Sequence, residues 1–203
     1  MKLNKIERLY TDNINKFGID SRAVGWNTKD SQYLRFEKLL NVVKDKSIPF
    51  TINELGCGYG ELYKYLQNHK YNFSSFNGYD ISQAMLDAFR NYINETQRIE
   101  LFKKSEIQTY ADYTITSGIF NTLCGIDRNK WPQHIKETLL NMFKYSDKGM
   151  AFNLLTSYVD YEDDNLFYGN PGEYIDFCKK EFSSKVNLYH DYDLYEWTLI
   201  VLK

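Results

Sequence analysis

A glycine-rich loop lies within residues 53–66, which read NELGCGYGELYKYL. Gly56, Gly58 and Gly60 stand at alternate positions, directly after the apolar run FTINEL at 50–55. We expect that run to be a buried strand and the loop to lead into a helix. Glycine lets a backbone turn sharply and approach a ligand closely, and open α/β sheets bind ligands at the carboxyl ends of their strands. The stretch therefore predicts a ligand-binding loop, with a plain glycine-rich turn as the alternative.

An acidic residue before the glycines narrows the class of ligand. Dinucleotide-binding loops read GxGxxG, whereas this loop reads GxGxG with Glu54 two positions ahead of its first glycine. A carboxylate repels a pyrophosphate and attracts an ammonium group. The loop therefore suits a zwitterionic nucleoside without phosphate, such as S-adenosylmethionine, and disfavours a dehydrogenase.

A second acidic residue follows the next expected strand. Asp80 ends the run SFNGYD at 75–80, where its carboxylate can accept hydrogen bonds from both hydroxyls of a ribose. Capping of the following helix is the alternative role, but Ser82 already supplies that cap. Met85 then stands where an apolar side chain can face an adenine.

Strands and helices alternate from residue 49 to the end of the chain. The expected strands are 50–55, 75–80, 98–102, 112–120, 149–155, 184–192 and 195–203, and the expected helices are 3–17, 29–46, 60–68, 82–93, 131–145 and 172–182. Such alternation predicts a parallel sheet with helices on both faces. A brief turn joins the last two strands, so the final strand runs antiparallel. We expect one three-layer α/β domain over 1–203, with a helical N-terminal lid at 1–48 and a core at 49–203.

These motifs resemble those of a known family. Residues 53–60, NELGCGYG, and 79–86, YDISQAML, are similar to the first two motifs of the class I S-adenosylmethionine-dependent methyltransferases. The resemblance implies a Rossmann-like, seven-stranded sheet that is mostly parallel with its last strand antiparallel. It also implies that S-adenosylmethionine is the cofactor and that its methyl group is transferred to an acceptor.

The resemblance assigns roles residue by residue. The glycine loop matches the segment that binds the methionine moiety, Asp80 matches the ribose-binding acid, and Ile81 matches a residue that packs on adenine. After the third strand, either Ser105 or Glu106 fills the place near the adenine amine. The residues expected to bind the cofactor are Trp26, Arg35, Glu54, Gly56, Cys57, Gly58, Gly60, Asp80, Ile81, Met85, Glu106, Ser117 and Gly118.

Two of these residues belong to the helical N-terminal extension. Trp26 stands in a polar loop before a helix, where it either packs as an anchor or helps to cover the cofactor. Arg35 either reaches the methionine carboxylate, pairs with Glu37 or lies on the surface.

The acceptor is expected to be a small molecule. The fourth strand ends in TSGIFN rather than the Asn/Asp-Pro-Pro-Tyr motif of enzymes that methylate nucleic-acid bases, and the net charge is −2. Phe120, Asn121, Tyr158, Tyr168 and Tyr192 are expected around the acceptor.

The histidines are the candidates for a general base. We expect His190 to be the base for a hydroxyl acceptor, with a hydrogen-bonded hairpin histidine as the alternative. His69 and His134 are expected on the solvent side of their helices.

The composition favours a cytoplasmic protein without a metal centre. The three cysteines, Cys57, Cys124 and Cys178, show no CxxC spacing, which disfavours zinc and disulfides. No apolar run approaches the roughly 20 residues needed to cross a bilayer, and the N-terminus lacks the apolar core of a signal peptide. We expect neither a membrane nor a nucleic-acid partner.

Two other functions remain open. Carboxylates at 160–164 would attract a cationic amine and make the protein an N-methyltransferase. A non-catalytic subunit that binds the cofactor and serves as a partner is the second alternative.

Overall fold

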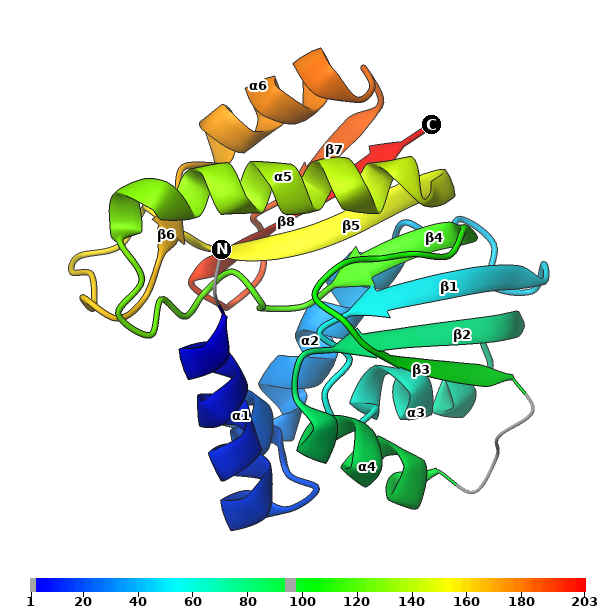
Figure 1. Cartoon of the computed structure of the whole chain (residues 1–203). Coiled ribbons are helices and arrows are strands. Elements are labelled where there is room, and N and C mark those ends of the chain that lie inside the picture. The colour runs from blue at the N-terminus through cyan, green and yellow to red at the C-terminus, as the bar shows by residue number, and fades with distance from the viewer. Residues whose placement is uncertain (1–2, 94–97) are drawn as a thin grey trace.

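One mostly parallel sheet organises the chain. The computed structural model describes residues 3–93 and 98–203, and the strands follow the order β3-β2-β1-β4-β5-β8-β7 (Figure 1). Their bounds are β1 Phe50–Leu55, β2 Phe73–Asp80, β3 Ile99–Lys103, β4 Ala111–Thr116, β5 Ser146–Thr156, β6 Tyr168–Gly169, β7 Val186–Tyr189 and β8 Glu196–Leu202. The helices are α1 Asn4–Phe17, η1 Ser21–Val24, α2 Lys29–Leu40, α3 Glu61–Asn68, α4 Gln83–Tyr92, η2 Arg128–Lys130, α5 Trp131–Lys144 and α6 Pro171–Glu181.

The strand directions confirm the predicted topology. Strands β1 to β5 pair in parallel, whereas β8 is antiparallel to both β5 and β7. The short strand β6 was not expected from the sequence and pairs with the last two residues of β5. It brings the long connection after β5 back to the carboxyl edge of the sheet.

Two elements end earlier than the sequence predicts. The helix expected over 29–46 ends at Leu40, because the polar and β-branched residues that follow favour turns over a helix. The strand expected over 112–120 ends at Thr116, because the chain turns at Gly118, where φ is +73°. Residues 117–121 consequently form a turn at the carboxyl edge.

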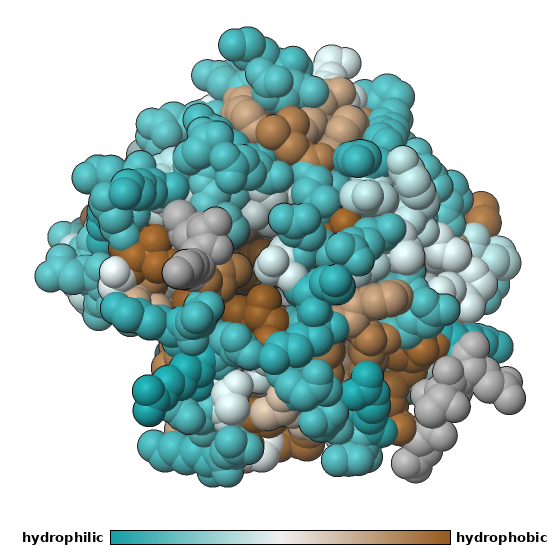
Figure 2. Space-filling model, viewed as in Figure 1, coloured by the Kyte–Doolittle hydropathy of each residue, from teal (hydrophilic) through white to brown (hydrophobic). Residues whose placement is uncertain are grey.

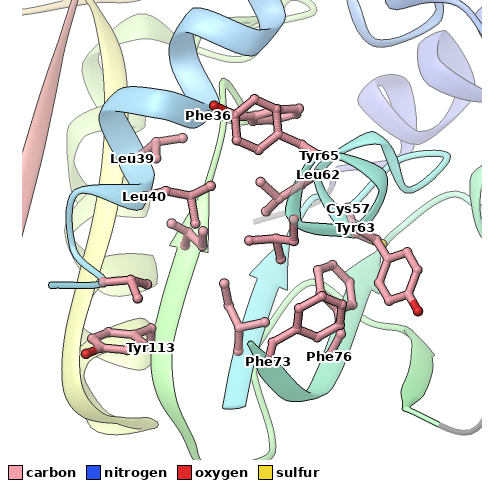
Figure 3. Close-up of a cluster of buried hydrophobic side chains, with 14 of the residues drawn as sticks. Phe36, Leu39, Leu40, Cys57, Leu62, Tyr63, Tyr65, Phe73, Phe76 and Tyr113 are labelled. Carbon is pink, nitrogen blue, oxygen red and sulfur yellow. The ribbon is translucent and has the colours of Figure 1, made fainter. Parts of the chain in front are cut away.

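Helices cover the two faces of the sheet in separate clusters. On one face, Phe36 and Leu39 of α2 and Leu62 of α3 belong to one buried cluster with strand residues such as Phe76 and Tyr113 (Figure 3). The other face is covered by α5 and α6, with Trp131 fully buried at the start of α5. Helix α1 lies at the carboxyl edge, beside α4 (Figure 1). The assignment of residues 1–48 as a lid stays a prediction, and residues 1 and 2 lie outside the described residues.

Gly60 and Gly25 offer a matched pair for testing the glycine loop. Both adopt the left-handed conformation, with φ of +89° and +84°. A Cβ on Gly60 would overlap the ring of Phe89, whereas one on Gly25 would meet nothing within 4 Å. Gly25→Ala should lower the free energy of unfolding by roughly 1–2 kcal/mol through backbone strain alone. Gly60→Ala should lower the free energy of unfolding by about 1–3 kcal/mol more than Gly25→Ala, because the added methyl group would overlap the packed ring of Phe89.

Urea denaturation of the two variants and the wild type measures both costs. Equal losses at the two positions would show that α4 moves aside freely and that Phe89 does not fix the loop.

Candidate active site

The glycine loop turns tightly at the carboxyl end of β1. The φ angles of Gly56 and Gly58 are +77° and +52°, and the amides of Gly56 and Cys57 both donate to the carbonyl oxygen of Tyr79, at 2.7 and 3.0 Å. These bonds tie the loop to the end of β2. A Cβ on Gly56 would overlap Ile119. The loop backbone is therefore held against both neighbouring strands.

Two cavities meet at this loop. The larger has a volume of about 100 Å³, and the smaller has about 30 Å³. Val24, Gly56 and Ser117 line both of them. The larger cavity is mainly apolar and extends between α1 and α5, where apolar side chains gather on the surface (Figure 2).

The smaller cavity contains polar atoms without a partner. Among the described residues, neither Oε2 of Glu54 nor Oγ of Ser117 makes a hydrogen bond, although both atoms are buried. Burial, together with the nearby charge of Asp80, raises the pKa of Glu54 well above its usual value. An ammonium group in this cavity would stabilise the Glu54 carboxylate, so the residues present fit a methionine moiety.

Asp80 lies on the wall of the larger cavity. Its Oδ2 accepts a hydrogen bond from the Gly58 amide at 2.9 Å, and its Oδ1 accepts one from the Ser82 amide at 2.8 Å. Burial raises the pKa of Asp80 to about 6 despite these bonds. A carboxylate has about four acceptor sites, so each oxygen can still accept a hydroxyl. Ser82 caps α4 by accepting from the Met85 amide at 3.3 Å.

The structure brings most of the predicted cofactor residues to the two cavities. The larger is lined by Gly56, Gly58, Asp80, Ile81, Met85, Ser117 and Gly118, and the smaller by Trp26, Glu54, Gly56, Cys57 and Ser117. Gly60 precedes α3 as its N-cap residue. At the end of β3, Ser105 lines the larger cavity, whereas Glu106 is exposed and outside the lining.

Arg35 lies outside both linings and binds another residue. Its Nε and Nη2 contact the carboxylate of the fully buried Glu196 at 2.7 to 3.0 Å. Its Nη1 donates to the carbonyl oxygen of Ser31 at 2.7 Å. Trp26 stacks on the guanidinium, with the Arg35 Cζ 3.7 Å from the ring centroid. The sequence suggested Glu37 as the ionic partner of Arg35, but the partner in the structure is Glu196.

Sequence reasoning missed the contribution of α5, and it named no residue of α1 within the expected lid. The prediction that His134 faces solvent is wrong, because His134 lines the larger cavity together with Trp131 and Thr138. These residues lie at the first, fourth and eighth positions of α5 and share one face, so helical spacing could have indicated them. Burial lowers the pKa of His134. Helix α1 contributes Tyr10 from the opposite side.

The predicted acceptor residues lie beyond the two cavities. Phe120 is buried in the core, and Asn121 donates to Glu196 at 3.4 Å. Tyr168 accepts from the Asp163 amide at 3.3 Å, and Tyr192 shares a hydrogen bond of 2.9 Å with Thr198.

The predicted base, His190, lies beside the remaining predicted acceptor residue, Tyr158, and both side chains are exposed. The rings of His190 and the exposed Tyr158 lie 5.9 Å apart. Across residues 3–93 and 98–203, no cluster of His, Cys, Asp and Glu has a geometry that could bind a metal ion.

The fold and the cavities define a class of protein. A Rossmann-like sheet, an acidic residue in β1 ahead of a glycine loop and an acid at the end of β2 are the features of a class I S-adenosylmethionine-dependent methyltransferase.

Comparison with known sequences identifies the family. The chain is 38% identical over 157 residues to the protein named "Putative methyltransferase Rv1506c" of Mycobacterium tuberculosis (strain ATCC 25618 / H37Rv), and the match covers 76% of this chain and 94% of that protein. The chain therefore belongs to the class I S-adenosylmethionine-dependent methyltransferases, as the sequence motifs predicted. No family profile matches the sequence.

Solved structures share the fold at low sequence identity. The magnesium protoporphyrin IX methyltransferase from Synechocystis PCC 6803, solved with bound S-adenosylmethionine, aligns with a TM-score of 0.65 and 13% identity over 97% of this chain and 96% of its own. A chain of the Pnkp1/Rnl/Hen1 RNA repair complex aligns with a TM-score of 0.64 and 16% identity over 99% of this chain and 47% of its own. At these identities the likeness concerns the fold alone.

The two raised carboxyl pKa values predict how cofactor binding depends on pH. In the free protein, protons bind Glu54 and Asp80 more tightly than usual, whereas an ammonium group and two hydroxyls favour the ionised carboxylates. Binding should therefore release protons, and affinity should weaken as the pH falls. With a pKa of about 6 for Asp80, the affinity for S-adenosylhomocysteine should fall at least about tenfold between pH 8 and pH 5.

Calorimetry in buffers of different ionisation enthalpy measures both the affinity and the protons released. Glu54→Gln should weaken binding at pH 8 and reduce the number of protons released, while the part due to Asp80 remains. An affinity that does not change with pH would contradict both assignments.

Proposed function

We propose that the chain transfers the methyl group of S-adenosylmethionine to a hydroxyl group of a small molecule. One observation carries this proposal: the joined cavities present an unpaired carboxylate, that of Glu54, at one end and the Asp80 carboxylate in an apolar pocket at the other. This pattern suits the ammonium group and the adenosine of the cofactor. Ser117 and Gly56, which line both cavities, would then lie beside the sulfur.

The acceptor would enter between the turn after β4 and the loops that follow β5 and β7. Side chains on these loops include aromatic residues with large exposed fractions, 67% for Tyr158, 81% for Tyr161 and 75% for Tyr195. Thr156 and Tyr195 are joined by a backbone hydrogen bond of 3.0 Å, which brings the two loops together. Exposed aromatic rings beside a catalytic pocket can stack on the apolar face of a sugar or metabolite ring.

The reaction is an in-line displacement, in which the bond from the methyl carbon to the sulfur breaks as a bond to the acceptor oxygen forms. Bound S-adenosylmethionine supplies the activated methyl group. The proton of the hydroxyl would pass to a ring nitrogen of His190, and the sulfur would retain the electron pair of the broken bond. Aligning the hydroxyl and excluding water are then the main tasks of the protein.

A cationic amine is the second candidate acceptor. Asp160 and Asp164 are exposed on the loop after β5, while Glu162 is paired with Arg128 at 2.8 Å. Exposed carboxylates attract a cation only at low ionic strength, so added salt should raise KM for an amine and leave KM for a neutral alcohol unchanged.

We also propose where the protein is located and which partners it lacks. Within residues 3–93 and 98–203, no helix combines the length and the apolar character that crossing a membrane requires. We keep the cytoplasm as the expected location and expect no nucleic-acid partner, since the formal net charge of −2 does not favour binding to phosphates.

His190→Asn tests the proposed base. With an alcohol acceptor found by transfer of labelled methyl from S-adenosylmethionine to a panel of small molecules, turnover should fall about 10²–10⁴-fold. The affinity for S-adenosylhomocysteine should stay within about twofold, because His190 lies outside both cavities.

His69→Asn is the matched control. His69 caps the end of α3 and bonds the carbonyl oxygen of Tyr65 at 2.9 Å, so its loss should leave turnover unchanged. Wild-type turnover in His190→Asn would show that His190 is a hairpin residue only. Transfer to amines alone would replace the alcohol by the second candidate.

A further inference from the structure

A row of buried polar side chains crosses the sheet on the face covered by α2, at the carboxyl ends of β1, β4 and β5 and the amino end of β8. Thr116 of β4 pairs with Phe152 of β5, so the next residues, Ser117 and Asn153, lie together on the opposite face of the sheet from that pair. Leu155 follows two positions after Asn153 and lies on the same face, and it pairs with Glu196 of β8. At one end of the row, Glu54 and Ser117 have unpaired atoms. At the other end, the side-chain polar groups of Asn153 and Glu196 all make hydrogen bonds within the protein. This half of the row therefore has a role other than binding a ligand.

The Glu196 carboxylate accepts hydrogen bonds from three side chains. Arg35 binds both of its carboxylate oxygens, and the Asn153 amide donates to Oε2 at 2.6 Å. Asn121 donates to Oε1 at 3.4 Å. With an exposed fraction of 0%, the carboxylate has no access to solvent, so its charge is compensated by these side chains alone.

The turn at Gly118 is fixed from two sides by this group. From the sheet, Oδ1 of Asn153 accepts from the Gly118 amide at 2.8 Å. From the opposite side, the indole of Trp26 packs so closely on Gly118 that a Cβ there would overlap it. Trp26 itself stacks on Arg35. The contacts therefore form a closed ring of Arg35, Trp26, Gly118, Asn153 and Glu196.

This ring borders the place where the methyl group would leave the cofactor. Gly118 lines the larger cavity, Trp26 lines the smaller one, and Ser117, adjacent to Gly118, lines both. A displacement of the turn would move the wall of the site toward or away from the sulfur.

We propose that Glu196, with Arg35 and Asn153, is a positioning residue that fixes the Gly118 turn and Trp26 at the point of methyl transfer. This inference rests on the proposed function for its catalytic meaning. Arg35 then acts on the site through Trp26 and Glu196 rather than by binding the methionine carboxylate.

Glu196→Gln should disconnect the ring while preserving its shape. The amide nitrogen would face a donor in either orientation, the Asn153 side-chain amide at the Oε2 position or Arg35 Nη2 at the Oε1 position, so one of these hydrogen bonds is lost. If the Asn153 side-chain amide flips to accept from the new amide nitrogen, its own nitrogen faces the Gly118 amide. Two donors then face each other, and the hydrogen bond that fixes the turn is lost. We expect hydrogen exchange at the Gly118 amide to accelerate at least about tenfold. We also expect the affinity for S-adenosylhomocysteine to fall about tenfold.

The double variant Arg35→Met, Glu196→Met separates positioning from stability. Replacing a buried ion pair by apolar side chains of similar volume is often neutral or stabilising, so this variant should fold even if Glu196→Gln does not. It should still show fast exchange at Gly118, a shifted indole resonance for Trp26 and weakened ligand binding.

Asp112→Asn is the matched control. Asp112 pairs with Lys148 at 2.8 Å and accepts from the Thr51 amide, near the start of β4 at the far edge of the sheet. Its loss should change stability without changing exchange at Gly118 or ligand affinity.

The outcomes separate the two proposals. If the wild type binds no S-adenosylhomocysteine, the proposed function fails, while the exchange measurement still tests the ring. If the wild type binds the ligand and the double variant retains wild-type exchange at Gly118 and wild-type affinity, the ring is structural only and the inference is overturned.

Discussion

The burial of Glu54 at the end of β1 is the constraint on which the site depends. An ionised carboxylate taken out of water without a partner is so costly that such a group normally binds a proton instead. The raised pKa of Glu54 expresses that cost, and the charge of Asp80 on the next strand adds to it. A protein that keeps an unpaired carboxylate oxygen of Glu54 buried near Asp80 gains stability from a ligand with complementary charge. In the proposed site, bound S-adenosylmethionine would supply the interactions that Glu54 lacks in the free protein.

The sheet explains why these groups meet. Parallel strands β1, β2 and β4 end at one edge, and the glycines after β1 let the chain turn there without a side chain in the way. The same edge receives β8 in the opposite direction, so that Glu196 begins a strand where the others end. An antiparallel final strand therefore does more than close the sheet, because it delivers a charged residue to the site from the end of the chain.

How much of the fold and the site could be predicted depends on how far apart in the sequence the interacting residues lie. The glycine loop, Asp80 and the Ser82 cap are encoded by neighbouring residues, and the order and direction of the strands follow from their alternation with helices. Arg35 and Glu196 are 161 positions apart, and only the folded sheet brings them together. His134 was misplaced because a polar side chain was assigned to solvent by its type, although it lies three positions after Trp131 and four before Thr138 on one face of α5. The strand β6 has two residues, which is too short for any pattern to indicate.

Helix α1 gives the site a further property, which concerns how fast a ligand comes and goes. Ile6 and Tyr10 form part of the wall of the larger cavity, whose volume of about 100 Å³ is well below the ~300 Å³ at the lower end for ligand sites. Thr11 shares a hydrogen bond of 2.8 Å with Ser82, and Glu7 pairs with Lys103 at 2.9 Å, so α1 is attached to the end of β3 and the start of α4. If α1 belongs to the lid that the sequence predicts, a nucleoside enters only when this helix moves away. At high ligand concentration, the rate of association should then be limited by the opening of α1 rather than by diffusion, and a product that fits well should leave slowly.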